Sequence, residues 1–236
     1  MMRALIADDE IYSREELESM LKETGEFTIS GKCVNAVEAI RAINRERPDV
    51  LFLDIQMPAI NGFELLSMID ENLMPSVVFV TAYDKYALKA FEENALDYLL
   101  KPVEKERLAK TVEKLKKRFV QGDKPVFTGP DIQKIPCIHS SKIKLIPTAE
   151  IEYVRSGESG VYVVCRNGEF YTDLTLQILE SKTPLVRCHK QFLVNIDLVD
   201  EIILRENMLA DIKTKSGRLI PVSRRYLKIL RETLRF

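Results

Sequence analysis

The stretch "DVLFLDIQMPAING", residues 49–62, places a carboxylate, Asp54, directly after the apolar residues 50–53. An apolar run of this length is typical of a buried strand, and burying an unpaired charge is costly. Either a local partner masks the charge of Asp54, or its side chain lies at the strand tip, where it can take part in chemistry. Pro58 and Gly62 follow at positions where they would shape the loop beyond the strand.

Four more short apolar segments accompany this one, with helical stretches between them. Strands are predicted at residues 3–7, 27–33, 49–54, 76–81 and 95–100, all expected to be buried on both faces. Helices are predicted at 11–24, 36–46, 62–72 and 85–93, and a last helix carries Leu108, Val112, Leu115 and Phe119 on one face, expected to be core. This alternation predicts an α/β fold with a doubly wound, five-stranded parallel sheet.

In a doubly wound sheet, ligands bind at the carboxyl ends of the strands. Five polar residues follow or end predicted strands at that edge: Asp8, Asp9, Asp54, Thr81 and Lys101. A single polar residue there commonly has no role, but five together favour a functional site. Two carboxylates about 4 Å apart repel by about 4 kcal/mol at an effective dielectric constant of about 20. Mg²⁺ would relieve this repulsion, and Asp54 could then act as nucleophile on a phosphoryl donor, with Lys101 and Thr81 binding phosphoryl oxygens.

The second half of the chain has a different composition. Residues 121–134 contain two glycines and two prolines and are predicted to be a linker. From residue 135 onward, short β-like segments alternate with turn signals, and a closing helix is expected from about Arg224. Residues 1–122 carry 17 Lys and Arg against 22 Asp and Glu, a balance of −5, whereas residues 123–236 carry 18 against 14, a balance of +4. The basic half is the candidate for binding a polyanion.

Within this half, "IPVSRRYLKIL" (residues 220–230) places Ser223 where it could cap a helix whose first turn holds Arg224 and Arg225. Cations there oppose the helix dipole, and an incoming phosphate would reverse the sign of that interaction. From the residues alone, a phosphate-binding arginine pair and a solvated loop pair are equally favoured.

The composition also limits the class of protein. No apolar stretch approaches the ~20 residues needed to span a bilayer. The N-terminus meets acidic residues where a signal peptide would have its apolar region, and the four cysteines form no C-x-x-C pair. These features predict a cytoplasmic protein with reduced thiols and no membrane partner.

Four motifs together resemble the receiver domain of two-component response regulators: "ADDE" (7–10), "FLDIQMPAING" (52–62), "VTAY" (80–83) and "ALDYLLKP" (95–102). The resemblance covers residues 1–120 and implies a flavodoxin-like fold. It implies that Asp54 accepts phosphate from a sensor histidine kinase. It also implies that Mg²⁺ is held by Asp9, Asp54 and the Gln56 carbonyl, with Asp8 acting through water.

The same resemblance implies a switch pair, Thr81 and Tyr98. Thr81 would turn toward the added phosphoryl group, and Tyr98 would fill the space that it leaves. The face formed by the two last helices and the strand between them would then change shape and create a dimer surface. Without the resemblance, Tyr98 would more often be a core residue.

Two segments of the second half, "LVRCHKQFLVN" (185–195) and "PVSRRYLK" (221–228), resemble the LytTR DNA-binding domain over residues 135–236. Over its full length the chain is similar to the YehT/BtsR type of LytTR regulator. The resemblance implies a mostly-β domain of about ten strands that inserts loops into successive major grooves. The expected DNA-binding residues are His189, Lys190, Gln191, Arg224 and Arg225, and a third loop, "RSGESG" (155–160), is expected beside them. Arg187 is open to a structural role as well.

These features predict a transcriptional response regulator that homodimerises on phosphorylation and binds promoter DNA, and that is not a turnover enzyme. Two alternatives remain open. The β half could bind a protein instead of DNA, which its modest charge permits. The first half could be a Mg²⁺-dependent phosphatase, although the sequence shows no sign of a substrate pocket.

Overall fold

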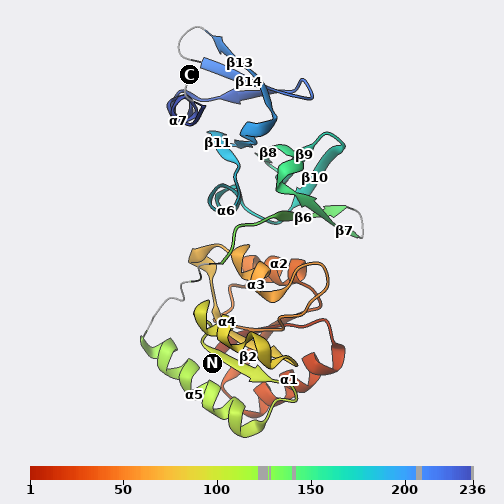
Figure 1. Cartoon of the computed structure of the whole chain (residues 1–236). Helices are drawn as coiled ribbons and strands as arrows, with labels where there is room; N and C mark the ends of the chain where they lie inside the picture. Colours follow the sequence, from red (N-terminus) through yellow and green to blue (C-terminus); the bar gives the residue numbers. More distant parts are fainter. Residues whose placement is uncertain (122–126, 128, 140–141, 206–208, 235–236) are drawn as a thin grey trace. The chain divides into compact units, whose positions relative to one another are not determined.

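A computed structural model of the chain describes residues 1–121, 127, 129–139, 142–205 and 209–234. The chain divides into two compact units, Met1–Pro130 and Asp131–Phe236, which Figure 1 shows in red to green and in green to blue. Among the described residues, no helix is both long enough and apolar enough to cross a membrane.

The first unit is built on one parallel sheet. Its strands are β1 (Met2–Ala7), β2 (Phe27–Cys33), β3 (Val50–Leu53), β4 (Ser76–Thr81) and β5 (Asp97–Leu100), in the order β2-β1-β3-β4-β5. Ala7 and Leu53, the last residues of β1 and β3, pair with each other, and Leu53 also pairs with Phe79, two residues before the end of β4. Residues that follow these strands therefore emerge together at one edge, and the strand order reverses between β1 and β3. The predicted doubly wound sheet is confirmed.

Helices cover both faces of this sheet. They are α1 (Ile11–Glu23), α2 (Ala36–Glu46), α3 (Gly62–Ser67), α4 (Ala87–Glu92) and α5 (Lys105–Gln121). Phe52 and Val78 pack in one core cluster with apolar residues of α1 and α5. Alternate strand residues face the other side, where the ring of Phe79 lies 4.8 Å from that of Phe63 at the start of α3.

The expectation that all five strands are buried on both faces is wrong for β2 and β5. These strands form the sheet edges, and both contain partly exposed positions. The expected helix 62–72 ends at Ser67, because Asp70 accepts a hydrogen bond from the Asn72 N–H and starts a separate 3₁₀ turn, Glu71–Leu73. The expected helix 85–93 is likewise a 3₁₀ turn, Asp84–Tyr86, followed by α4.

The last helix departs from its predicted core face at one end. Leu108, Val112 and Leu115 are buried, whereas Phe119 is 57% exposed. The 17 residues of α5 extend about 25 Å at 1.5 Å per residue. The strands beneath have 4 to 7 residues, or about 13 to 23 Å. Phe119 lies in the last turn of α5, which is longer than any strand of the sheet.

The second unit is mostly β, as predicted, with ten strands in the part of the chain that the structure describes. Seven form one antiparallel sheet in the order β11-β12-β8-β9-β10-β6-β7: β6 (Lys134–His139), β7 (Lys142–Pro147), β8 (Ile151–Gly157), β9 (Gly160–Cys165), β10 (Gly168–Thr172), β11 (Val186–His189) and β12 (Phe192–Val194). A second sheet holds β13 (Val199–Arg205), β14 (Leu209–Thr214) and β15 (Leu219–Val222). Two helices, α6 (Leu176–Lys182) and α7 (Arg224–Leu234), complete the unit.

Apolar and polar contacts join the two sheets of this unit. Cys188 and Val194 pack in one cluster with Ile212 of β14 and with Leu227 and Leu230 of α7. A buried carboxylate adds a polar link.

This carboxylate belongs to Glu152 of β8, which is 4% exposed. It accepts hydrogen bonds from the hydroxyls of Thr214 at 3.1 Å and Ser216 at 2.5 Å. These contacts join β8 to the end of β14 and to the turn before β15, the strand that leads into α7.

Candidate phosphoacceptor site and nucleic-acid interface

Three carboxylates meet at the carboxyl edge of the parallel sheet. One oxygen from each of Asp8, Asp9 and Asp54 lies within 4.8 Å of the others. The backbone N–H of Asp54 donates to the Ala7 carbonyl at 2.8 Å, so the tips of β1 and β3 hold two of these acids side by side. Asp54 lies at the strand tip as predicted, yet it is only 6% exposed. Its charge therefore requires a partner.

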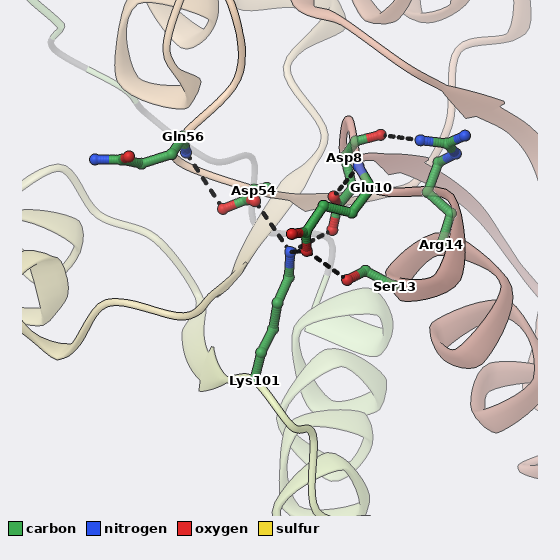
Figure 2. Close-up of polar contacts among 7 residues, drawn as sticks. All are labelled: Asp8, Glu10, Ser13, Arg14, Asp54, Gln56 and Lys101. Carbon is green, nitrogen blue, oxygen red and sulfur yellow. Dashed lines mark hydrogen bonds and ion pairs between the residues drawn. The ribbon is translucent and has the colours of Figure 1, made fainter.

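Lys101 is that partner. Its Nζ lies 3.0 Å from Asp54 Oδ2 and 2.8 Å from Asp8 Oδ2, and Figure 2 shows the side chain reaching up between the two acids. Burial lowers the pKa of Lys101, but the hydrogen bonds to Asp8 and Asp54 outweigh burial and raise that pKa above its usual value. Burial raises the pKa of Asp8, against the effect of the Lys101 ammonium.

Residues at the start of α1 complete the cluster, and the sequence analysis did not single them out. Lys101 Nζ also lies 3.2 Å from Glu10 Oε2, and the Ser13 hydroxyl donates to the same oxygen at 2.9 Å. The bond from Ser13, followed by that from Lys101, lowers the pKa of Glu10. Arg14, 9% exposed, donates to the Asp8 carbonyl at 2.5 Å (Figure 2). Only Glu10 had a sequence signal, as the last letter of "ADDE".

The loop after Asp54 is shaped by backbone contacts. The Gln56 N–H donates to Asp54 Oδ1 at 3.3 Å, whereas the Gln56 side chain points away from the cluster in Figure 2 and donates to the Tyr86 hydroxyl at 3.1 Å. A Cβ on Gly62 would lie 2.6 Å from the Asp54 carbonyl oxygen. Gly62 is therefore required because the loop returns against the phosphoacceptor candidate itself.

Thr81 ends β4, and Tyr98 is the second residue of the neighbouring strand β5, where it pairs with Phe79. Thr81 is fully buried, and its hydroxyl has no hydrogen-bond partner among the described residues. Tyr98 is half-buried, and its hydroxyl donates to the carbonyl of Tyr83, two residues after Thr81. The Tyr98 carbonyl in turn accepts from Arg107 at 3.0 Å. The structure thus connects both members of the predicted pair to the segment that leaves β4.

The donor set fits a hard divalent cation. Three clustered carboxylates offer the oxygen ligands that Mg²⁺ prefers, and Asp9, the exposed member, opens the cluster to solvent. A cavity of about 510 Å³ borders the cluster and is lined by residues that include Asp9, Gln56 and Lys89. The cluster can therefore be reached by an ion and by a phosphoryl donor.

In the second unit, three loops lie side by side. The Ser156 N–H, in the "RSGESG" loop, donates to the Gln191 carbonyl at 2.8 Å. The Ser223 N–H, before α7, donates to the Cys188 carbonyl at 3.1 Å. The turn at residues 189–191 therefore lies between the "RSGESG" hairpin and the start of α7. The structure brings together the three segments that the resemblance to the LytTR domain implies approach DNA.

Arg187 donates hydrogen bonds to the backbone of the turn at residues 189–191. Its Nε donates to the His189 carbonyl at 2.9 Å and its Nη2 to the Lys190 carbonyl at 2.6 Å. Of the two roles left open for Arg187, this geometry supports the structural one. The Gln191 N–H donates to His189 Nδ1 at 3.2 Å, which assigns the imidazole proton to Nε2. Burial, followed by the charges of Lys190 and Arg187, lowers the pKa of His189.

Arg224 and Arg225 begin α7, as predicted. Both are exposed, and neither forms an ion pair with any residue in the described ranges. The Ser223 carbonyl accepts from the N–H groups of Tyr226 and Leu227, each at 3.0 Å, which closes the first turn of the helix. Lys190 and Gln191 are also exposed. Three exposed cations therefore lie on segments that contact each other through the Ser223–Cys188 backbone hydrogen bond, an arrangement suited to a polyanion.

Two family models match the chain, one in each half. Residues 4–113 match the response regulator receiver domain, and residues 141–235 match the LytTr DNA-binding domain. A response regulatory protein of Vibrio cholerae is 52% identical over 236 residues, all of both chains. The chain belongs to the LytTR family of DNA-binding response regulators. The transcriptional regulatory protein BtsR of Escherichia coli is 48% identical to this LytTR regulator over 239 residues, 99% of each chain. A response regulatory protein of Shewanella oneidensis is 44% identical over 236 residues, all of both chains.

Proposed function

We propose that this LytTR regulator accepts a phosphoryl group on Asp54 from a sensor histidine kinase. A carboxylate oxygen of Asp54 forms a bond to phosphorus as the bond to the donor imidazole nitrogen breaks. The electron pair stays on that nitrogen, which takes a proton from solvent. Lys101 neutralises a phosphoryl oxygen. The observation that carries the proposal is the pairing of Lys101 with Asp54 beside two further carboxylates.

Mg²⁺ would bind Asp9, Asp54 and the Gln56 carbonyl, with Asp8 acting through water. When bound, it would supply positive charge that offsets the repulsion between these carboxylates and an incoming phosphoryl group. Neighbouring residues of the chain position the groups that would bind the ion. The Gln56 N–H fixes the rotation of the Asp54 carboxylate, and Arg14 holds the Asp8 backbone in place.

The conformational change on phosphorylation would begin at the hydroxyl of Thr81. Because this buried donor has no partner among the described residues, a phosphoryl oxygen on Asp54 would gain its hydrogen bond without breaking another. Thr81 would turn toward Asp54 and carry Tyr83, the acceptor of the Tyr98 hydroxyl. Tyr98 would then move into the vacated space. This rearrangement of α4, β5 and α5 would create the surface for a homodimer.

Two linked DNA-binding domains would bind promoter DNA with higher avidity than one. The DNA contacts would come from five residues: His189, Lys190, Gln191, Arg224 and Arg225. The receiver would comprise residues 1–120, the linker 121–134 and the DNA-binding domain 135–236. The protein would act in the cytoplasm, where promoter DNA and the kinase domain meet, and it would release its own phosphoryl group without turning over a substrate.

The experiment that tests this function measures promoter affinity of the full chain with and without acetyl phosphate and Mg²⁺. The duplex is first selected from a random pool. We expect tighter binding after phosphorylation, no such gain for Asp54→Asn, and a dimer in solution only for the phosphorylated chain. A gain that persists in Asp54→Asn would contradict the assignment of Asp54.

A further inference from the structure

The ammonium group of Lys101 is fully engaged by carboxylates. A lysine ammonium has three N–H donors. Nζ of Lys101 lies 2.8 Å from Asp8, 3.0 Å from Asp54 and 3.2 Å from Glu10, one acceptor for each donor. Figure 2 shows all three acids converging on this nitrogen. A phosphoryl oxygen that binds Lys101 must therefore displace one of them.

The three acceptors differ in how readily they can leave. The side chains of Asp8 and Asp54 are 5% and 8% exposed, and both follow strands of the sheet. The side chain of Glu10 is 65% exposed and lies at the entry to α1. Withdrawing a buried carboxylate from its cation is costly, whereas an exposed one is readily solvated. Glu10 is thus the acceptor that a phosphoryl oxygen would replace.

Glu10 is also held in its competing position. The Ser13 hydroxyl, one turn into α1, donates at 2.9 Å to Glu10 Oε2, the same oxygen that contacts Lys101. This bond restricts the rotation of an otherwise exposed side chain and keeps it directed at the ammonium. A surface acid that only interacts with solvent would not need a hydrogen bond such as the one from Ser13. This bond therefore favours a role for Glu10 at Lys101.

We propose that Glu10 competes with the phosphoryl group for Lys101 and thereby slows phosphorylation of Asp54. The inference rests on the proposed phosphoacceptor function and adds a residue that sets its rate. Glu10 acts as a positioning residue: it occupies the donor that the phosphoryl oxygen needs, and its negative charge repels the approaching anionic donor. Removing Glu10 has the opposite sign to removing Lys101, which would slow the reaction.

Substitution Glu10→Gln removes the charge and keeps the size. The exposed ion pair between Glu10 and Lys101 is weak, so removing it should accelerate phosphorylation of Asp54 only modestly. We expect a rate about two- to fivefold higher than in the wild type. Ser13→Ala frees Glu10 from its hydroxyl and should accelerate the reaction by a smaller factor. The matched control is Glu16→Gln, which removes the same charge from an exposed position in α1, the helix that Glu10 precedes, and should leave the rate unchanged.

The test measures the initial rate of Asp54 phosphorylation by acetyl phosphate at saturating Mg²⁺, and the affinity for beryllofluoride, a phosphoryl mimic that needs no covalent step. Faster phosphorylation and tighter beryllofluoride binding in Glu10→Gln, relative to Glu16→Gln, support the proposal. Equal or slower phosphorylation in Glu10→Gln, with a wild type that is labelled on Asp54, overturns it and leaves the proposed function intact. A wild type that takes no phosphoryl group on Asp54 overturns both.

Discussion

Replacing Arg187 tests whether the turn at residues 189–191 must be held in place for DNA binding. Arg187 is 16% exposed on its side chain and donates to two carbonyls of this turn. Each hydrogen bond stabilises the turn by about 1 kcal/mol. Arg187→Ala should therefore destabilise the ordered conformation of the turn by about 2 kcal/mol. The third contact, to Glu180 at 3.2 Å, is an ion pair with a half-exposed partner and adds little. A cost of about 2 kcal/mol corresponds to about 30-fold weaker DNA binding.

Salt dependence separates this indirect role from direct contact. Affinity for a selected duplex would be measured by fluorescence anisotropy at several salt concentrations. Arg225→Ala should remove a phosphate contact and reduce the slope of log affinity against log salt by about 0.9. Arg187→Ala should weaken binding with an unchanged slope. Arg187→Lys is the charge-conserving control, and it should behave like Arg187→Ala because an ammonium cannot replace the planar fork.

Two results would refute this reasoning. One is wild-type affinity for Arg187→Ala. The other is a loss of salt slope in Arg187→Ala as large as that in Arg225→Ala, which would make Arg187 a DNA contact.

Three further substitutions test the receiver. Gly62→Ala should destabilise the first unit by about 2 kcal/mol or more, measured by denaturant unfolding, because its Cβ would lie 2.6 Å from the Asp54 carbonyl oxygen. Thr81→Val should raise the free energy of unfolding by about 1 kcal/mol by removing a buried hydroxyl that lacks a partner in the described structure, while phosphorylation no longer tightens DNA binding. For Asp97, burial raises the pKa, but bonds from Arg107, Thr111 and Lys114 outweigh burial and lower it. A carboxylate with a lowered pKa stabilises the fold above its unfolded pKa of about 3.9 and loses that contribution as the pH falls through its folded value. Asp97→Asn should therefore lower the free energy of unfolding by about 2 kcal/mol at neutral pH and reduce the further loss of stability below about pH 4. A variant that loses as much stability below about pH 4 as the wild type would contradict this.

Much of the receiver could be predicted because local patterns determine it. The apolar runs before Asp8, Asp54 and Lys101 define strand ends, and parallel pairing brings those ends to one edge. The contact of Glu10 with Lys101 could not be predicted, although Glu10 ends the motif "ADDE", because an exposed acid before a helix is indistinguishable in the sequence from an ordinary surface residue. Its contact with Lys101 joins residues 91 positions apart and depends on how α1 leaves the sheet.

The second unit shows the same limit more strongly. The sequence indicates short strands and a closing helix beginning at Arg224, and both are present. The adjacency of the three loops depends on the sheet order β11-β12-β8 and on the bond from Ser223 to Cys188. No periodicity encodes such long-range pairing. For the same reason, the sequence leaves a structural role and a DNA-contacting role equally open for Arg187. Only the folded turn shows that its guanidinium group donates to the backbone carbonyls of His189 and Lys190.

The central claim is that Asp54 carries the phosphoryl group, and chemical trapping tests it most directly. The full chain would be incubated with acetyl phosphate and Mg²⁺, treated with borohydride, which reduces an aspartyl phosphate to homoserine, and mapped by peptide mass spectrometry. The account predicts homoserine at position 54 and nowhere else. Homoserine at Asp8 or Asp9, or an unmodified Asp54 beside a label at another residue, would contradict it.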